Sequence, residues 1–380
     1  MGSQNLAKSG TILFDFPVPP TDVTDENGMN KVENAVVSVL APHFGDLKQV
    51  SKHEMTSKGE RVGEVRLYVE GSNGVTMTLR IYNDTFLVTA TVEYDKTVLV
   101  DALSYDEIKS LEQKMIKLLN TEKKTKAMPE LKRGLKHDIY FNTSDDRILE
   151  YDIKKMVYEK QSEFQHVQIA YSENYGNILV LDGLMNLAES DLIYTESLMW
   201  KGKMDYKGKN VLILGGGDGA LLHELLKEGP AFVTMIDIDD TVMQQCREHL
   251  RSACGTTLDT YETDKYQVIV GDCVAFMKKC IESGRKFDVV FGDLTDIPIS
   301  PIPQGEIWDF VLQIIQLSFS ILEKGGVYMT HANGVSSKES LKTFETAVLG
   351  HLARPVSFTT LENFVPSFME KWVFYQIKET

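Results

Sequence analysis

Residues 211–219 read VLILGGGDG, an apolar run that leads directly into a loop of four glycines and one aspartate. The apolar run predicts a buried strand, and the segment ALLHELL at 220–226 predicts a helix. Glycines between a strand and a helix permit a tight turn and let a ligand approach the backbone closely. We therefore predict a nucleotide- or nucleoside-binding strand–loop–helix unit at this point of the chain.

Strand-like runs and helical segments alternate beyond this loop. The predicted strands cover residues 211–214, 233–238, 267–270, 287–291 and 327–330. Such alternation is typical of an α/β fold with a mostly parallel sheet. Because ligands bind outside the carboxyl ends of the strands in these sheets, polar residues at the strand ends are candidate binding residues.

Three acidic residues stand in or after the first three predicted strands. Asp237 lies at the end of the second strand, where a carboxylate accepts hydrogen bonds from ribose hydroxyls. Asp218 lies inside the glycine loop, where it would repel a pyrophosphate and attract a sulfonium ion. An S-adenosyl ligand is therefore favoured over a dinucleotide, although Asp218 could instead only cap the helix. Asp272 follows the third strand and suits either an adenine amino group or a helix N-cap.

The fourth predicted strand ends in the sequence GDLTD at 292–296. A primary amine, with a pKa of about 10, is protonated at neutral pH and cannot attack as a nucleophile. A carboxylate at a strand tip can orient the ammonium group and accept its proton. We assign this role to Asp293, and Asp296 either shares it or is a turn residue.

Further acidic residues lie in loops that we expect at the same crevice, namely Glu189, Asp191 and Glu370. Carboxylates crowded around one groove repel each other unless a multiply charged cation lies among them. A polyamine is such a cation, so the acidic groove predicts a polyamine substrate. Taken singly, each of these acids is more often a solvated loop residue than a ligand.

The whole chain of 380 residues is acidic, since 55 Asp and Glu outnumber 40 Lys and Arg and give a formal net charge of −15. This charge disfavours nucleic acid as a partner and suits a cationic ligand. No apolar run reaches the roughly 18 residues of a membrane span, and the start MGSQNLAKSG has no apolar signal core. We therefore expect a cytoplasmic protein with no membrane partner.

The cysteines give no sign of a metal site or a disulfide framework. They form no CxxC pair, and no histidine lies at zinc-finger spacing from them. We expect reduced thiols and no metal. The four residues are Cys246, Cys254, Cys273 and Cys280.

Three regions of the chain differ in pattern. Residues 1–135 predict an α+β unit with a helix that starts at the capping box SYDE, 104–107, and a basic linker over 121–137. Residues 136–188 predict β-hairpins, and residues 189–380 hold the α/β part described above. The strand-like runs of the first region are at 64–69, 76–82 and 86–92.

These residues resemble the aminopropyltransferase family, and most closely its spermine synthase branch. The resemblance covers nearly the whole chain. Its most specific stretches are NLAESDLIYT at 186–195, the glycine loop at 215–219, GDLT at 292–295, VPS at 365–367 and WVFY at 372–375. The AESD and DLT forms are the ones that separate the spermine-forming from the spermidine-forming members.

The resemblance implies a Rossmann-like, methyltransferase-type catalytic domain, a small β-hairpin domain and an amino-terminal domain like S-adenosylmethionine decarboxylase that forms a homodimer. It implies transfer of the aminopropyl group of decarboxylated S-adenosylmethionine, a co-substrate, to spermidine, which gives spermine and methylthioadenosine. No separate cofactor is implied.

The resemblance also assigns roles to single residues. It makes Asp293 the proton acceptor. It implies donor binding by Gln165, Gly215, Gly217, Asp237, Asp272 and Cys273, and polyamine binding by Tyr194, Asp218, Glu370, Phe368 and Asp191. Two residues depart from the family pattern: Asp237 replaces a Glu, and Phe368 replaces a Tyr in the acceptor pocket. The lost hydroxyl bears on which acceptor is used.

Three other functions stay open on the sequence alone. An aminopropyltransferase of the same fold could use putrescine or another diamine. A methyltransferase would bring the donor carboxylate of S-adenosylmethionine next to Asp218, which disfavours it. A catalytically weak relative that only binds polyamines is disfavoured by Asp293 and left open by Phe368.

Overall fold

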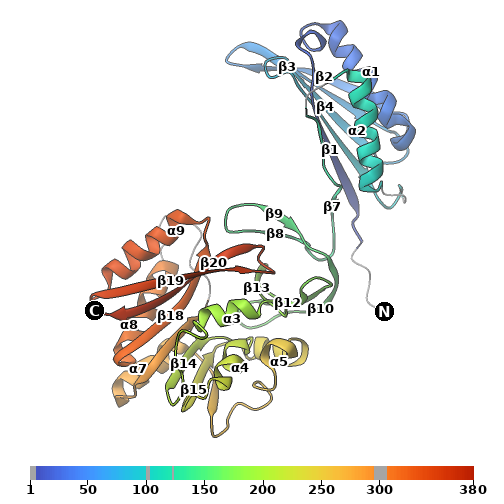
Figure 1. Ribbon diagram of the computed structural model, residues 1–380. Helices are drawn as coiled ribbons and strands as arrows, with labels where there is room; N and C mark the ends of the chain where they lie inside the picture. The colour runs from blue at the N-terminus through green and yellow to red at the C-terminus, as the bar shows by residue number, and fades with distance from the viewer. Residues whose placement is uncertain (1–5, 100–102, 122–123, 295–305) are drawn as a thin grey trace. The chain divides into compact units, whose positions relative to one another are not determined.

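The computed structural model of the protein describes residues 6–99, 103–121, 124–294 and 306–380 (Figure 1). The chain forms two compact units, an amino-terminal unit that ends at His137 and a carboxy-terminal unit that begins at Asp138. The predicted boundary between residues 188 and 189 lies within the second unit. The division into three domains therefore stays a prediction.

The amino-terminal unit is one antiparallel sheet with two helices packed against one of its faces (Figure 1). The strands lie in the order β2-β3-β4-β5-β1-β6, and β7 also pairs with β1. The elements are β1 (Ser9–Pro17), α1 (Glu26–Phe44), β2 (Lys48–Ser57), β3 (Glu60–Val69), β4 (Thr76–Tyr82), β5 (Leu87–Asp95), α2 (Tyr105–Leu119), β6 (Lys126–Ala127) and β7 (Leu131–Arg133), with a 3-10 turn at Pro20–Asp22.

Local sequence explains most of this unit. Met77, Leu79 and Ile81 alternate along β4 and are fully buried on the face that the helices cover. The predicted capping box is confirmed, because the Ser104 hydroxyl accepts from the Glu107 amide and the Glu107 carboxylate accepts from the Ser104 amide. The expected linker over 121–137 contributes β6 and β7 instead, and both strands pair antiparallel with β1.

The carboxy-terminal unit begins with antiparallel hairpins, as predicted. A four-stranded sheet has the order β10-β11-β12-β13, and a two-stranded ribbon, β8-β9, precedes it. The strands are β8 (Tyr140–Asn142), β9 (Ile148–Glu150), β10 (Ile153–Gln161), β11 (His166–Ser172), β12 (Gly176–Leu181) and β13 (Leu184–Ala188).

The main sheet has seven strands in the order β16-β15-β14-β17-β18-β20-β19. The first five run parallel, β20 pairs antiparallel with β18, and β19 pairs antiparallel with β20. The strand order reverses between β14 and β17. The strands are β14 (Asn210–Gly215), β15 (Phe232–Asp237), β16 (Tyr266–Val270), β17 (Phe287–Asp293), β18 (Leu322–Gly334), β19 (Val356–Val365) and β20 (Glu370–Glu379).

Helices cover both faces of this sheet (Figure 1). Val211 and Ile213 of β14 face one hydrophobic cluster and Leu212 and Leu214 face the other, as expected of a strand buried on both sides. The helices are α3 (Leu192–Leu198), α4 (Ala220–Lys227), α5 (Asp240–His249), α6 (Arg251–Cys254), α7 (Cys273–Ser283), α8 (Glu306–Ile321) and α9 (Lys338–Thr343), followed by a π turn at Phe344–Val348 and a 3-10 turn at Leu349–His351.

This unit confirms the predicted α/β fold with a mostly parallel sheet. A doubly wound sheet binds ligands where its strand order reverses, which places the expected site at the carboxyl ends of β14 and β17. Asp296 lies outside the described residues. Among the described residues, no helix combines the length and the apolar composition that crossing a membrane requires.

Candidate active site

A cavity of ≈ 260 Å³ opens at the carboxyl ends of β14, β15 and β17. The described residues that line it include no Lys or Arg. They include four aspartates, Asp182, Asp218, Asp237 and Asp293. The other polar groups of its wall are Gln165, Asn186, Tyr194 and His331, and its apolar residues include Leu179, Leu181, Leu184, Met185 and Phe368. The cavity is therefore suited to a positively charged ligand with apolar parts.

The glycine loop fits tightly between the strand ends. Gly215 has a φ of +83°, and a Cβ there would lie 2.0 Å from the carbonyl oxygen of Asp293. A Cβ on Gly217 would lie 2.7 Å from Oδ2 of Asp237. The glycines are therefore needed because the loop packs directly on the two acidic strand tips.

Three of the aspartates share one poorly solvated environment. Burial raises the pKa of Asp293 to about 7, the charge of Asp218 adds to the rise and His331 opposes it. Burial raises the pKa of Asp237 to about 6, with a further contribution from Asp218. Burial also raises the pKa of Asp218. A bound cation would relieve this mutual repulsion, which is the electrostatic property expected of a site for ammonium or sulfonium groups.

Tyr194 brings a hydroxyl to the side of the cavity where Asp293 lies. It lies on α3, and its Oη is 3.5 Å from Oδ1 of Asp293. Its ring packs edge-on against Phe368 at 5.9 Å and lies 5.7 Å from the ring of His331. The aromatic packing fixes the direction of the Tyr194 hydroxyl toward Asp293.

The hairpin sheet supplies the opposite, apolar wall. Leu179 and Leu181 come from β12, and Leu184 and Met185 come from β13. Gln165 lies between β10 and β11, where its side-chain amide donates to Asp239 Oδ2 at 3.1 Å. Gln165 therefore faces the same end of the cavity as Asp237, whose Oδ1 accepts from the Asp239 amide at 2.9 Å.

Eight of the predicted site residues meet at this cavity: Gln165, Tyr194, Gly215, Gly217, Asp218, Asp237, Asp293 and Phe368. Asp218 also accepts from the Ala220 amide at 2.7 Å, so it caps the helix start and faces the cavity at once. The remaining four predicted residues do not line it.

Two of these four are carboxylates that hold loops together. Asp191 is 1% exposed and accepts from the amide and hydroxyl of Ser367 and from the Ala188 amide. Glu370 is 8% exposed and accepts from the amide and hydroxyl of Ser144. Neither carboxylate lines the cavity, so their polyamine-binding roles stay predictions.

Asp272 and Cys273 lie at the start of α7. Asp272 is the N-cap residue and accepts from the Val274 amide at 2.8 Å. The buried thiol of Cys273 has its pKa raised to about 11 by burial. Glu189, another expected crevice residue, accepts from the Asn177 amide and the Ser252 hydroxyl and lines a separate cavity. The four cysteines are free and buried.

The sequence reasoning missed several residues of the cavity wall. One of them is His331, which follows Thr330 toward the end of β18. Asp237 and Asp293 were selected as polar residues at the ends of predicted strands. The same criterion applies to His331, because a Thr-His pair follows the apolar run of the fifth parallel strand. Phe164 and Asp182 lie in turns of the hairpin sheet, where no strand end of the parallel sheet marks them as candidates.

Two family models match this chain. Residues 191–380, half of the chain, match a spermine/spermidine synthase domain. Residues 139–189 match a spermidine synthase tetramerisation domain. Together the two matches cover the hairpin sheet and the main sheet, which are the two parts that build the cavity.

Individual relatives agree with the family models. The chain is 34% identical over 185 residues to polyamine aminopropyltransferase 1 of Hyperthermus butylicus, covering 48% of this chain and 61% of that protein. It is 29% identical over 241 residues to thermospermine synthase ACAULIS5 of Arabidopsis thaliana, covering 61% of this chain and 67% of that protein. The chain thus spans about two thirds of the length of these relatives.

A solved structure shares the fold. A spermidine synthase in complex with the transition-state analogue AdoDATO aligns with a TM-score of 0.52 at 19% identity, covering 64% of this chain and 81% of that one. This likeness concerns the fold, and the chemistry depends on the residues of the cavity.

Proposed function

The chain belongs to the spermine/spermidine synthase family, and from that premise we propose that it transfers the aminopropyl group of decarboxylated S-adenosylmethionine to spermidine. The products are spermine and methylthioadenosine. The observation that carries the proposal is the convergence of Asp218, Asp237 and Asp293 on one cavity whose described wall contains no Lys or Arg. Both substrates are cations, so the negative charge of these carboxylates attracts both of them into the cavity.

The cavity has a donor end and an acceptor end. Asp237 ends β15 beside Gly217, where it suits the ribose hydroxyls of the donor, with Gln165 nearby. Asp218 lies in the glycine loop after β14, the strand between those that end in Asp237 and Asp293, and its charge raises the pKa of both. We assign Asp218 to the ammonium groups and the sulfonium that meet there.

The reaction needs one proton transfer. The acceptor nitrogen attacks the methylene carbon bound to sulfur, the C–S bond breaks, and its electron pair leaves with neutral methylthioadenosine. The nitrogen gives its proton to a carboxylate, which we assign to Asp293. A carboxylate whose pKa is about 7 in the free protein accepts a proton at neutral pH more readily than an ordinary aspartate.

Phe368 and Tyr194 bear on the choice of acceptor. Both rings line the cavity, and Phe368 provides an apolar surface without a hydroxyl. Such a surface suits the methylene segments of a longer amine, and an ammonium can also lie on an aromatic face. We infer that spermidine, which has more methylene groups than putrescine, is the preferred acceptor.

We also propose a homodimer held by the amino-terminal unit, which we expect to be similar to S-adenosylmethionine decarboxylase, in the cytoplasm. What supports an oligomer is the match of residues 139–189 to a model described as a tetramerisation domain. That match lies in the hairpin sheet, so it also offers an alternative location for the interface.

An acceptor panel tests this function. Purified protein with decarboxylated S-adenosylmethionine is expected to release methylthioadenosine at least about tenfold faster with spermidine than with putrescine at equal concentration. Chromatography against spermine and thermospermine standards then identifies the product. Equal rates, or a faster reaction with putrescine, would refute spermidine as the preferred acceptor. No methylthioadenosine with any amine would refute aminopropyl transfer.

A further inference from the structure

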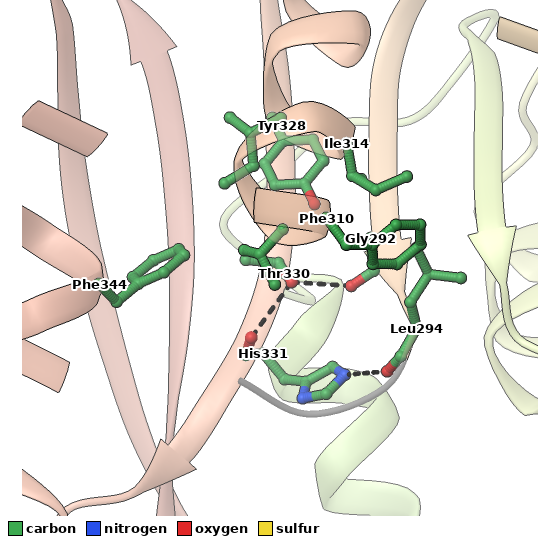
Figure 2. Close-up of a pocket in the computed structure, with 10 residues that line it drawn as sticks. Gly292, Leu294, Phe310, Ile314, Tyr328, Thr330, His331 and Phe344 are labelled. Carbon is green, nitrogen blue, oxygen red and sulfur yellow. Dashed lines mark hydrogen bonds between the residues drawn. The ribbon is translucent and has the colours of Figure 1, made fainter. Parts of the chain in front are cut away.

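Three successive carbonyl oxygens at the end of β17 each accept a hydrogen bond from a different partner. Two of the donors are consecutive side chains of β18, the neighbouring strand, and the third is the amide of Gly216 in the glycine loop. The tip that carries Asp293 is thus held from both sides, as Figure 2 shows for the β18 side. The bonds run from Thr330 Oγ1 to Gly292 O at 2.8 Å, from Gly216 N to Asp293 O at 3.0 Å and from His331 Nε2 to Leu294 O at 3.1 Å.

His331 is the outermost of these donors. Its side chain is 4% exposed, and its ring lies 5.7 Å from that of Tyr194 and 5.9 Å from that of Trp372. A carbonyl oxygen can only accept, so Nε2 must carry the hydrogen in its bond to Leu294. The same nitrogen lies 4.0 Å from Oδ1 of Asp293.

Of the three carbonyl groups, that of Leu294 depends most on a side-chain donor to fix its position. Gly292 pairs with Thr330 along the parallel ladder, whereas Leu294 lies beyond the last residue of β17. The hydrogen bond from His331 therefore links β18 to the residue that follows the last residue of β17. Since Leu294 follows Asp293 directly, fixing its carbonyl fixes the peptide plane next to the carboxylate.

We propose that His331 is a positioning residue for Asp293: its Nε2–H holds the Leu294 carbonyl and so keeps the Asp293 carboxylate aimed at the cavity. The inference rests on the proposed function, because it concerns the residue that accepts the proton. The aromatic packing of His331 between Tyr194 and Trp372 gives the donor a fixed direction, and a displacement of the order of 1 Å at a reacting group can cost about a hundredfold in rate.

Two substitutions separate the hydrogen bond from the shape of the ring. His331→Phe keeps a planar ring for packing and removes the donor. His331→Gln replaces the ring and keeps an N–H at a similar reach. If the bond to Leu294 is what matters, the Phe variant is expected to lower kcat at least about tenfold with little change in KM for the donor. The Gln variant is expected to stay within about threefold of the unchanged protein.

Met329→Leu provides a matched control. Met329 is a fully buried neighbour on the same strand, belongs to the core cluster that also contains Tyr194 and Trp372, and does not line the cavity. This substitution conserves volume and is expected to leave kcat within about twofold. A Phe variant of His331 with a kcat within twofold, or a Gln variant as impaired as the Phe variant, would overturn the proposal.

Hydrogen–deuterium exchange gives a readout that does not depend on activity. The peptide covering residues 287–294 is expected to exchange faster in His331→Phe than in the unchanged protein, and at the unchanged rate in His331→Gln. Should the unchanged protein transfer no aminopropyl group, the proposed function fails while this comparison still decides the positioning role. Unaltered exchange in the Phe variant would contradict it, and if that variant does not fold, His331→Asn, whose shorter amide cannot reach Leu294, takes its place with the same expectations.

Discussion

At the scale of single residues, Asp293 is the proton acceptor that we propose. Replacing it with Asn preserves its shape and its contact with Tyr194 but removes the ability to accept a proton. We expect Asp293→Asn to lower kcat by about 10²–10⁴-fold, with an unchanged circular dichroism spectrum. Asp288→Asn, at the opposite end of the same strand, is the matched control and should retain activity. A near-normal rate for Asp293→Asn would remove this residue from the role of base.

The same variant measures how much the ionised, buried carboxylate of Asp293 lowers the stability of the folded protein. The pKa of Asp293 is raised in the folded protein from 3.8 to about 7, so between these values the folded state binds more protons than the unfolded state. The free energy of unfolding therefore falls as the pH rises from 3.8, and the contribution of this group is fully lost once the pH has passed about 7. Asn cannot ionise, so Asp293→Asn should gain stability relative to the unchanged protein between pH 4 and pH 8, by up to about 4 kcal/mol.

Urea unfolding of both proteins across this range, without substrates, measures the difference. A difference that does not change with pH would contradict the raised pKa of Asp293. Since Asn and a protonated carboxyl are similar in shape, the two proteins should have nearly equal stability at pH 4.

Sequence reasoning at this scale succeeded where a residue's place follows from its own strand. Asp237 and Asp293 end parallel strands, and the strand ends meet at the cavity. Asp191 and Glu370 bond instead to Ser367 and Ser144, partners 176 and 226 residues away in sequence. Such distant hydrogen bonds leave no local pattern, so the sequence does not show which partners these carboxylates bond to within the protein.

At the scale of elements, the glycine loop after β14 packs closely on the strand end that carries Asp293. Gly215→Ala would place a Cβ 2.0 Å from the Asp293 carbonyl oxygen at a φ of +83°. We expect the positive φ to cost about 1–2 kcal/mol and the overlap to add about 1–3 kcal/mol, with a loss of turnover as Asp293 is displaced.

Gly229→Ala is the matched control for this substitution. Gly229 also has a positive φ, +70°, but a Cβ there would meet nothing within 4 Å. It should therefore show the backbone cost alone and keep full activity. Equal destabilisation of the two variants by urea unfolding, with activity retained in both, would contradict the tight packing of the loop on the strand tip.

Elements were predictable where periodicity or capping is local. The strand at 76–82 and the helix after Ser104 have strict alternation or a capping box, and both are present. The segment 121–137 was expected to be a linker because its charges suggested solvated surface. Its strands β6 and β7 form because β1, more than a hundred residues earlier, offers an open edge.

At the scale of the whole molecule, each unit has its own hydrophobic core. The cluster of the amino-terminal unit contains residues from Ile12 to Ala127, and the clusters of the other unit start at Val167. A fragment covering residues 138–380 is therefore expected to fold by itself. If the amino-terminal unit holds the dimer, light scattering should find this fragment monomeric and the full chain dimeric.

An oligomer that survives the deletion would locate the interface in residues 138–380 and refute the proposed role of the amino-terminal unit. The hairpin sheet, which matches a tetramerisation domain, would then be the interface to mutate next. The sequence could not decide between these surfaces, since association depends on shape across a whole face rather than on a motif.

We propose that a ring of carboxylates gathers two cations and that Asp293 takes a proton from one of them. A crystal structure of the protein with methylthioadenosine and spermidine tests it directly. We expect one amine nitrogen of spermidine within about 2.7–3.2 Å of an Asp293 carboxylate oxygen, on the side of the cavity that faces the methylthio group. Spermidine bound elsewhere, or an Asp293 carboxylate turned away from every amine, would contradict the account.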